Sequence, residues 1–308
     1  MSHVPVMLNE VLAHLKPVDD EVYVDGTFGA GGYTQAFLDG ADCTVIAIDR
    51  DPSAQERAKT LKAKYGERLV FLHGCFGDVE DLLKGAGFEK VDGFVLDLGV
   101  SSMQLDQAER GFSFRFDGPL DMRMDTSGGK TAADIVNSMP ERELADLIYK
   151  YGEERHSRRV AKTIIERRRE KKFETTSDLA DVVRSVVPRS GDDIDPATRT
   201  FQALRIVVND ELGELERALG AAEKILNPGG RVIIVSFHSL EDSMVKDCLR
   251  EKSGNAPGVS RHSLVQPEKT APVFDIKSKK SVQPSEEEAR DNPRARSAKL
   301  RAGIRREA

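Results

Sequence analysis

The sequence predicts an α/β protein with one mostly parallel sheet and a helical subdomain inserted between the fourth and fifth strands. Three observations support this prediction. Short apolar segments alternate with helical patterns over the first hundred residues, and a glycine-rich turn follows the first of these segments. A second glycine turn, Asn227–Gly230, leads into the apolar run Arg231–Ser236 after a long stretch of helical periodicity. Such alternation is typical of parallel strands joined by helices.

The first hundred residues contain four expected strands, each a short apolar run rich in β-branched residues. The expected strands are 22–25, 44–49, 69–72 and 91–97. The expected helices between them are 30–38, 52–65 and 78–84. Pro52 suits the first position of its helix because its missing N–H is not needed there, with Asp51 as the N-cap.

Residues 98–130 follow the fourth strand and show neither helical nor strand periodicity. A loop of this length inside a compact domain is uncommon and is usually functional or disordered. Large apolar side chains recur through it, including Leu105, Phe112 and Met122, and these favour packing over disorder. A long ordered loop at the carboxyl end of a parallel strand is where open α/β sheets place their chemistry.

Helical periodicity dominates the middle of the chain. The expected helices are 141–151, 155–169, 177–187 with Ser177 as its N-cap, a longer stretch from 197 to 226, and 240–250. Residues 253–272 are expected to form a mobile loop, and 273–282 with 297–305 a terminal strand pair. We therefore expect a discontinuous sheet domain, residues 1–104 with 206–308, and an inserted helical domain, 105–205.

The charge is unevenly distributed along the 308 residues. The net charge is −6, yet 155–172 holds nine Lys or Arg against two acids, and 277–308 holds ten against five. Basic patches on an acidic protein fit a polyanion bound along one face, although a solvated helix face is the alternative for either patch. No run approaches the roughly 18 apolar residues of a membrane span, and the N-terminus lacks a signal-peptide pattern.

The three cysteines, Cys43, Cys75 and Cys248, are scattered and odd in number. We interpret them as free thiols of a reducing cytoplasm, without zinc spacing. No cluster with metal-ligand spacing stands out elsewhere, so a metal site is not expected.

The glycine-rich turn has the features of a nucleoside site. Asp25 precedes it, Gly29, Gly31 and Gly32 allow a tight turn, and Asp49 ends the next strand, where an acid binds ribose hydroxyls in nucleoside-binding α/β folds. For the glycines alone, the alternative is that they form a turn between strand and helix and bind no ligand. The dinucleotide motif G-x-G-x-x-G fails because Thr34 stands at its third glycine, and no nucleoside-triphosphate loop is present.

Specific motifs extend this pattern from the N-terminus to the C-terminus. They are DGTFGAGG, AIDRDP, VDGFVLDLGVSS, RGFSF, GPLDMRMD, YGEER, FQALRIVVN, GGRVIIVSFHSLED and NPRARSAKLR. On these motifs the chain resembles the RsmH (MraW) family, the bacterial 16S rRNA cytosine-N4 methyltransferases. The resemblance covers essentially the whole chain.

The resemblance implies a class I S-adenosylmethionine-dependent methyltransferase sheet (Rossmann-like) with an inserted helical domain that recognises the RNA. It also implies a substrate, the exocyclic N4 of a cytidine in the decoding centre of the small ribosomal subunit, and a homodimer. The implied cofactor contacts are Gly31, Gly32, Tyr33, Asp49, Phe76, Asp97 and Gln104. Tyr33 stands where the family commonly has histidine, and Met103 where it commonly has proline.

Catalysis at N4 needs alignment and a proton acceptor, because the lone pair of N4 is delocalised into the ring. Asp97 ends the fourth strand and is the first candidate acceptor, with a purely cofactor-binding role as the alternative. His238 is a candidate contact to the base or a phosphate, or a structural hydrogen-bonding group. The phenylalanines 112, 114 and 116 either stack a cytosine or pack in the helical insert. The candidate phosphate contacts are Arg115, Arg123 and the basic segment 155–172.

Two rival functions remain open at this level. One is a methyltransferase of similar fold acting on a small molecule or a protein, which leaves the basic patches without a role. The other is a ribosome-assembly factor that binds S-adenosylmethionine without catalysis.

Overall fold

The computed structural model describes residues 5–189, 194–254 and 271–307. The chain divides into two compact units, Met1–Gly99 with Leu212–Ala308 (the sheet unit) and Val100–Glu211 (the helical unit). The unit boundaries differ from the expected 104/105 and 205/206. Helix α10 (Thr198–Asn209) runs unbroken through residue 205, and Ser101 caps the short helix α5 (Ser102–Asp106) of the helical unit. The expected loop 253–272 falls mostly outside the described residues.

The sheet unit contains a seven-stranded sheet in the order β3-β2-β1-β4-β5-β7-β6. Its strands are β1 (Val22–Asp25), β2 (Thr44–Asp49), β3 (Leu69–His73), β4 (Val91–Asp97), β5 (Leu226–Ser236), β6 (Phe274–Asp275) and β7 (Lys299–Arg305). The first five are parallel, whereas β7 pairs antiparallel with both β5 and β6. The expected class I methyltransferase sheet is confirmed. The terminal strand pair is shorter than expected, since within residues 273–282 only β6 and Val282, which bridges to Leu300, pair with β7.

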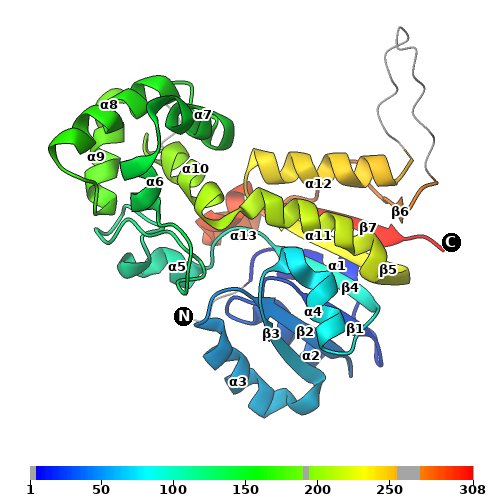
Figure 1. The fold of residues 1–308 in the computed structure, drawn as a ribbon. Helices are drawn as coiled ribbons and strands as arrows, with labels where there is room; N and C mark the ends of the chain where they lie inside the picture. The colour runs from blue at the N-terminus through cyan, green and yellow to red at the C-terminus, as the bar shows by residue number, and fades with distance from the viewer. Residues whose placement is uncertain (1–4, 190–193, 255–270, 308) are drawn as a thin grey trace, which may run out of the picture. The chain divides into compact units, whose positions relative to one another are not determined.

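Helices cover both faces of this sheet, which explains why its strands are apolar on both sides. Along β1, Tyr23 points into one apolar cluster and its neighbour Val24 into the other. The first cluster holds α1 (Leu8–Leu15), α2 (Gly32–Gly40) and α3 (Ala54–Tyr65). The second holds α4 (Val79–Gly85), α11 (Glu211–Ile225) and α12 (Ser239–Lys252). Figure 1 shows α11 and α12 side by side over the sheet.

Three helix starts differ from the sequence expectation. Helix α2 begins at Gly32 rather than at residue 30, because Gly31 before it adopts a left-handed φ of 82°. Helix α3 begins at Ala54 with Ser53 as the N-cap, so the placement of Pro52 at its first position was wrong. The carboxylate of Asp51 instead accepts the amide of Ser53 at 2.9 Å. Thr175, not Ser177, caps α9 (Thr176–Val186), because its hydroxyl accepts the amide of Asp178.

The helical unit contains α5, α6 (Ala132–Ser138), α7 (Glu141–Gly152), α8 (Ser157–Glu170), α9 and α10 around one apolar core. The long loop before α6 is ordered by this core. Leu120, Met122 and Met124 are buried in it, and backbone hydrogen bonds join Leu120 to Glu174 and Thr176 to Gly118. Among the described residues, no helix combines the length and the apolar character needed to cross a membrane.

Candidate active site

The glycine-rich turn after β1 adopts the backbone shape that only glycine takes without strain. Gly29 has φ 52° and Gly31 has φ 82°, both in the left-handed region. A Cβ on Gly31 would lie 2.6 Å from Leu61 Cδ1 and 2.9 Å from the ring of Phe28. The turn is therefore fixed by packing as well as by conformation, at the carboxyl edge of the sheet.

Asp25 holds this turn together from the inside. Its side chain is 1% exposed and accepts hydrogen bonds from the Thr27 amide at 3.2 Å, the Thr34 amide at 3.2 Å and the Thr34 hydroxyl at 2.7 Å. Burial raises the pKa of Asp25 to about 6. The acid that precedes the glycines in the sequence thus points its carboxylate into the turn.

Asp49 ends β2 beside the same turn and keeps acceptor capacity. One carboxylate oxygen accepts the Gly29 amide at 2.7 Å, and the other accepts the Asp51 amide at 2.8 Å. The residue is half-buried, and burial raises the pKa of its carboxyl. Each oxygen retains a lone pair, so the group can accept two further hydrogen bonds, as a ribose diol requires.

Asp97 ends β4 and carries an unsatisfied buried oxygen. Its backbone amide donates to the Thr27 hydroxyl at 2.6 Å, while Oδ1 is enclosed and has no hydrogen-bond partner within the described parts of the chain. Burial, followed by the charges of Asp25, Glu241 and Glu288, holds the pKa of Asp97 well above its usual range. Leaving such an oxygen unpaired is costly, which indicates a site that a bound donor or cation completes.

These groups fit S-adenosylmethionine, the cofactor expected from the sequence. The ligand has ribose hydroxyls for Asp49, and its sulfonium and ammonium charges suit the acidic surroundings of Asp97. The absence of a Cβ at Gly31 lets the turn pack tightly on Leu61 and Phe28 at this edge of the sheet. The sheet unit therefore brings Gly31, Gly32, Asp49 and Asp97 to one edge.

Phe76 follows β3 in a short 3₁₀ turn, Phe76–Asp78, held by a residue that sequence reasoning missed. The next amide, of Gly77, donates to Glu214 Oε2 at 2.8 Å, and Arg217 donates to Glu214 Oε1 at 2.8 Å. Glu214 is 4% exposed on the apolar face of α11, beside Leu215 and Ala218. The signal in the sequence that could have identified Glu214 is an acidic residue on an otherwise apolar helix face.

Tyr33 stands in the first turn of α2 with its ring fully committed to packing. The ring is 4% exposed, stacks on Phe37 with centroids 6.1 Å apart, and its hydroxyl donates to the carbonyl of Val6. Burial keeps the pKa of its hydroxyl well above the ordinary value. A Cβ on Gly32 would meet Pro5 Cγ at 2.1 Å, so the same segment also covers Gly32. The backbone of Tyr33 is thus its candidate contact to a cofactor.

Gln104 belongs to the helical unit, where it closes the first turn of α5. Its side-chain oxygen accepts the Ser101 amide at 2.9 Å, and its own amide donates to the Ser101 hydroxyl at 3.2 Å. This reciprocal capping box buries Gln104 to 7% exposure. Met103 lies within the same turn, which forms without the proline common in the family, and its carbonyl accepts the Gln107 amide at 3.0 Å.

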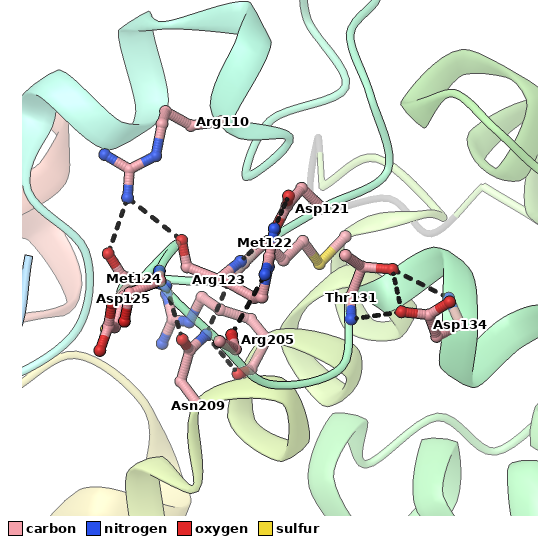
Figure 2. Close-up of polar contacts among 12 residues, drawn as sticks. Arg110, Asp121, Met122, Arg123, Met124, Asp125, Thr131, Asp134, Arg205 and Asn209 are labelled. Carbon is pink, nitrogen blue, oxygen red and sulfur yellow. Dashed lines mark hydrogen bonds and ion pairs between the residues drawn. The ribbon is translucent and has the colours of Figure 1, made fainter.

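A second buried polar network orders the loop before α6 within the helical unit. The amide side chain of Asn209 accepts the Met124 N–H at 2.8 Å and donates to the Met122 carbonyl at 2.8 Å. Arg110 donates to the carbonyls of Arg123 and Met124, as Figure 2 shows. These contacts come from three separate motifs of the sequence.

The other candidate RNA contacts of the loop differ in availability. Arg123 forms a two-bond ion pair with Asp121, with both distances 2.8 Å, so its guanidinium is engaged in the loop. Phe112 is buried and Phe114 packs edge-on against Phe201, whereas Phe116 is 61% exposed. Two of the three phenylalanines therefore serve packing, as one interpretation held. Arg115 is exposed.

His238 serves the fold as an N-cap. Its ring accepts the Glu241 amide at the start of α12, and the Glu241 side chain accepts the Phe237 amide at 2.8 Å. The structural interpretation of this histidine accounts for its position.

Comparison with known proteins shows the family of this chain. A model of the MraW methylase family matches residues 1–306. Proteins called "Ribosomal RNA small subunit methyltransferase H" are similar over almost their whole length. The one from Paramagnetospirillum magneticum is 60% identical, covering 98% of this chain and 95% of the relative. The one from Rhodospirillum rubrum is 59% identical and covers 97% of this chain and 93% of the relative. The one from Hyphomonas neptunium is 58% identical and covers 99% of this chain and 89% of the relative. The chain therefore belongs to the MraW methylase family, whose methyl donor is S-adenosylmethionine.

Proposed function

We propose that this methylase transfers a methyl group to the exocyclic N4 of a cytidine in the decoding centre of 16S rRNA, within the small ribosomal subunit. Support for the ribosomal RNA comes from relatives 53–60% identical over almost the full chain, all named for that activity. Support for cytosine N4 comes from the sequence motifs shared with the RsmH family. The basic segment 155–172 adds a surface suited to a polyanion.

In the proposed reaction, N4 forms a bond to the methyl carbon, the carbon–sulfur bond breaks, and N4 loses a proton. S-adenosylmethionine supplies an electrophilic methyl group on a sulfonium, which leaves as a neutral thioether. Asp49 would bind the ribose, and the turn at Gly29 and Gly31 would orient the donor. Phe76 would cover the adenine, with its position set by Glu214 through Gly77.

Asp97 is the proposed acceptor of the N4 proton. The observation that carries this role is its enclosed, unpartnered Oδ1 at the carboxyl end of β4. The raised pKa of Asp97 makes its carboxylate a stronger base than an ordinary aspartate near neutral pH. A proton acceptor of this kind contributes about 10²–10⁴-fold to rate.

The deciding experiment is nucleoside mass spectrometry of 16S rRNA from cells that lack the gene. The strain is complemented with the wild type, with Asp97→Ala, or with Asp81→Asn, an exposed acid on α4 as the control. We expect N4-methylcytidine to disappear on deletion and to return with the wild type and the control only. Persistence of the nucleoside in the deletion strain would contradict the proposal.

Further measurements separate the two roles of Asp97 and the rival functions of the protein. Calorimetry with S-adenosylhomocysteine shows whether Asp97→Ala has lost the donor site or only the transfer step. A small-molecule or protein methylase would leave 16S rRNA unmodified by the purified enzyme. An assembly factor without catalysis would leave rRNA methylation unchanged by Asp97→Ala.

A further inference from the structure

The helical unit has a surface hollow where α7 ends and α8 begins. Its volume is about 470 Å³, and its lining residues are Tyr149, Arg155, His156, Ser157, Arg158 and Arg159. Three of these six are arginines and none is acidic. The size lies within the range of small-ligand sites, which is about 300–1,000 Å³, and suits one nucleotide.

The basic segment 155–172 divides into two parts with different roles. Toward its end, Arg168 donates to the carbonyls of Val136 and Met139 at 2.7 and 2.8 Å, and Arg167 donates to the carbonyl of Lys171 at 3.0 Å. These two side chains complete helix ends and hold the unit together. Arg169 and Lys172 are exposed beyond them, but it is at the beginning of α8 that three arginines surround one hollow.

The arginines of the hollow are weakly engaged by comparison. Arg158 and Arg159 are exposed, and their nearest side-chain partners, Asp146 and His156, lie 3.5 Å away. Arg155 is exposed and has no ion pair within the described ranges. A phosphate can therefore replace water around these groups without breaking a strong internal pair.

The acids nearest the hollow do not cancel its charge. Glu154 is 3% exposed and accepts the His156 amide at 2.7 Å, so its carboxylate stabilises the turn between α7 and α8. Asp146 lies between Arg158 at 3.5 Å and Arg142 at 3.9 Å and is shared by both. The lining of the hollow itself contains three arginines and no acid.

Tyr149 adds an aromatic surface to this charge. Its ring is 64% exposed although its neighbour Ile148 is fully buried in the core of the helical unit. An exposed aromatic ring beside several arginines is typical of proteins that stack an unpaired base and bind its phosphate. A phosphate-only or carboxylate site has no use for such a ring.

We propose that this hollow binds one unpaired nucleotide of the RNA substrate, with a phosphate held by Arg155 and Arg159 and the base stacked on Tyr149. The proposal rests on the proposed function, because it takes RNA as the substrate. It adds a contact outside the sheet unit, at a definite place on the helical unit.

The test is RNA binding by the full-length protein at several salt concentrations, using a 16S rRNA fragment that contains the decoding centre. Replacing Arg155 and Arg159 together by Gln should weaken binding at least tenfold and make the slope of log affinity against log salt about 2 shallower. Tyr149→Ala should weaken binding about tenfold and leave the slope unchanged, and Tyr149→Phe should restore most of the affinity. Lys84 and Lys224, both exposed in the sheet unit, replaced together by Gln are the charge-matched control, which should change affinity less than twofold.

The outcomes separate this inference from the function on which it rests. If the wild type neither binds nor methylates the RNA, the proposed function fails. If the wild type methylates RNA but the hollow variants bind like the Lys84 and Lys224 control, the hollow is not the contact. Competition by polyglutamate as strong as by polyuridine would overturn the nucleotide assignment. Equal binding of S-adenosylhomocysteine by all variants confirms that the sheet unit is intact.

Discussion

The side-chain amide of Asn209 donates a hydrogen bond of 2.8 Å to the carbonyl of Met122, whose φ is +65°. Left-handed backbone is unfavourable for a residue with a Cβ, so the surrounding structure must hold Met122 in place. Asn209 does so from 87 residues away, and its oxygen also accepts the amide of Met124. This pair joins the motifs GPLDMRMD and FQALRIVVN, which are far apart in the sequence, and gives both motifs one structural role.

Replacing Asn209 by Ala should therefore destabilise the protein by about 2–4 kcal/mol, because two buried backbone groups lose their partners. Urea unfolding followed by circular dichroism measures the change. Gln107→Ala, an exposed substitution in the same loop, should lie within about 0.5 kcal/mol of the wild type. An Asn209→Ala protein as stable as this control would show that the network does not hold the loop.

Asp25 should give the protein a distinctive dependence on pH. Its pKa in the folded state, about 6, lies above the ordinary value of 3.8, so the folded state binds this proton more tightly. The stability that it contributes is fully present below about pH 4 and is lost as pH rises through 6. Asp25→Asn cannot titrate, so the unfolding free energy of the wild type relative to the variant should fall by about 2 kcal/mol between pH 4 and 7.

Carbon-13 NMR of the Asp25 carboxyl provides the direct measurement, with an expected midpoint near pH 6. A midpoint near 4, or a free-energy difference that does not change with pH, would mean that the carboxyl is hydrated rather than enclosed in the turn.

The sheet could be predicted from sequence because its signals are local. The apolar runs Val91–Asp97 and Arg231–Ser236 carry their structure within a few residues. The turn expected at residues 227–230 was wrong, because β5 already begins at Leu226 and its register against β4 shifts over these residues. The missed features depend on partners far along the chain. Glu214 holds Gly77 across 137 positions, and Asn209 holds Met122 across 87, so neither leaves a periodic signal. The predicted start of α3 was wrong for a local reason. Asp51 caps a turn at Ser53 and not the first turn of the helix.

Glu214 should act on the donor site as a positioning residue. Glu214→Ala removes the acceptor of the Gly77 amide and frees the turn that carries Phe76, so the Kd for S-adenosylhomocysteine should rise about tenfold. Glu214→Gln keeps one acceptor oxygen and should recover part of this loss. Glu216→Ala, exposed on the same helix, is the control and should bind like the wild type. Calorimetry that finds the same Kd for all four proteins would remove Glu214 from the site.

Asp97 should set how the rate of methyl transfer depends on pH. Only its carboxylate can accept the N4 proton, and its pKa is raised, so the rate under saturating donor should rise with pH until that group is ionised. Asp97→Asn keeps the shape of the side chain but cannot accept a proton, and we expect kcat to fall about 10²–10⁴-fold and this rise to disappear. Single-turnover assays across pH, with the Kd for S-adenosylhomocysteine measured alongside, separate the two roles of the residue. If Asp97→Asn raises the Kd tenfold or more but keeps a wild-type kcat and pH profile at saturating donor, then Asp97 binds the cofactor and another group receives the proton.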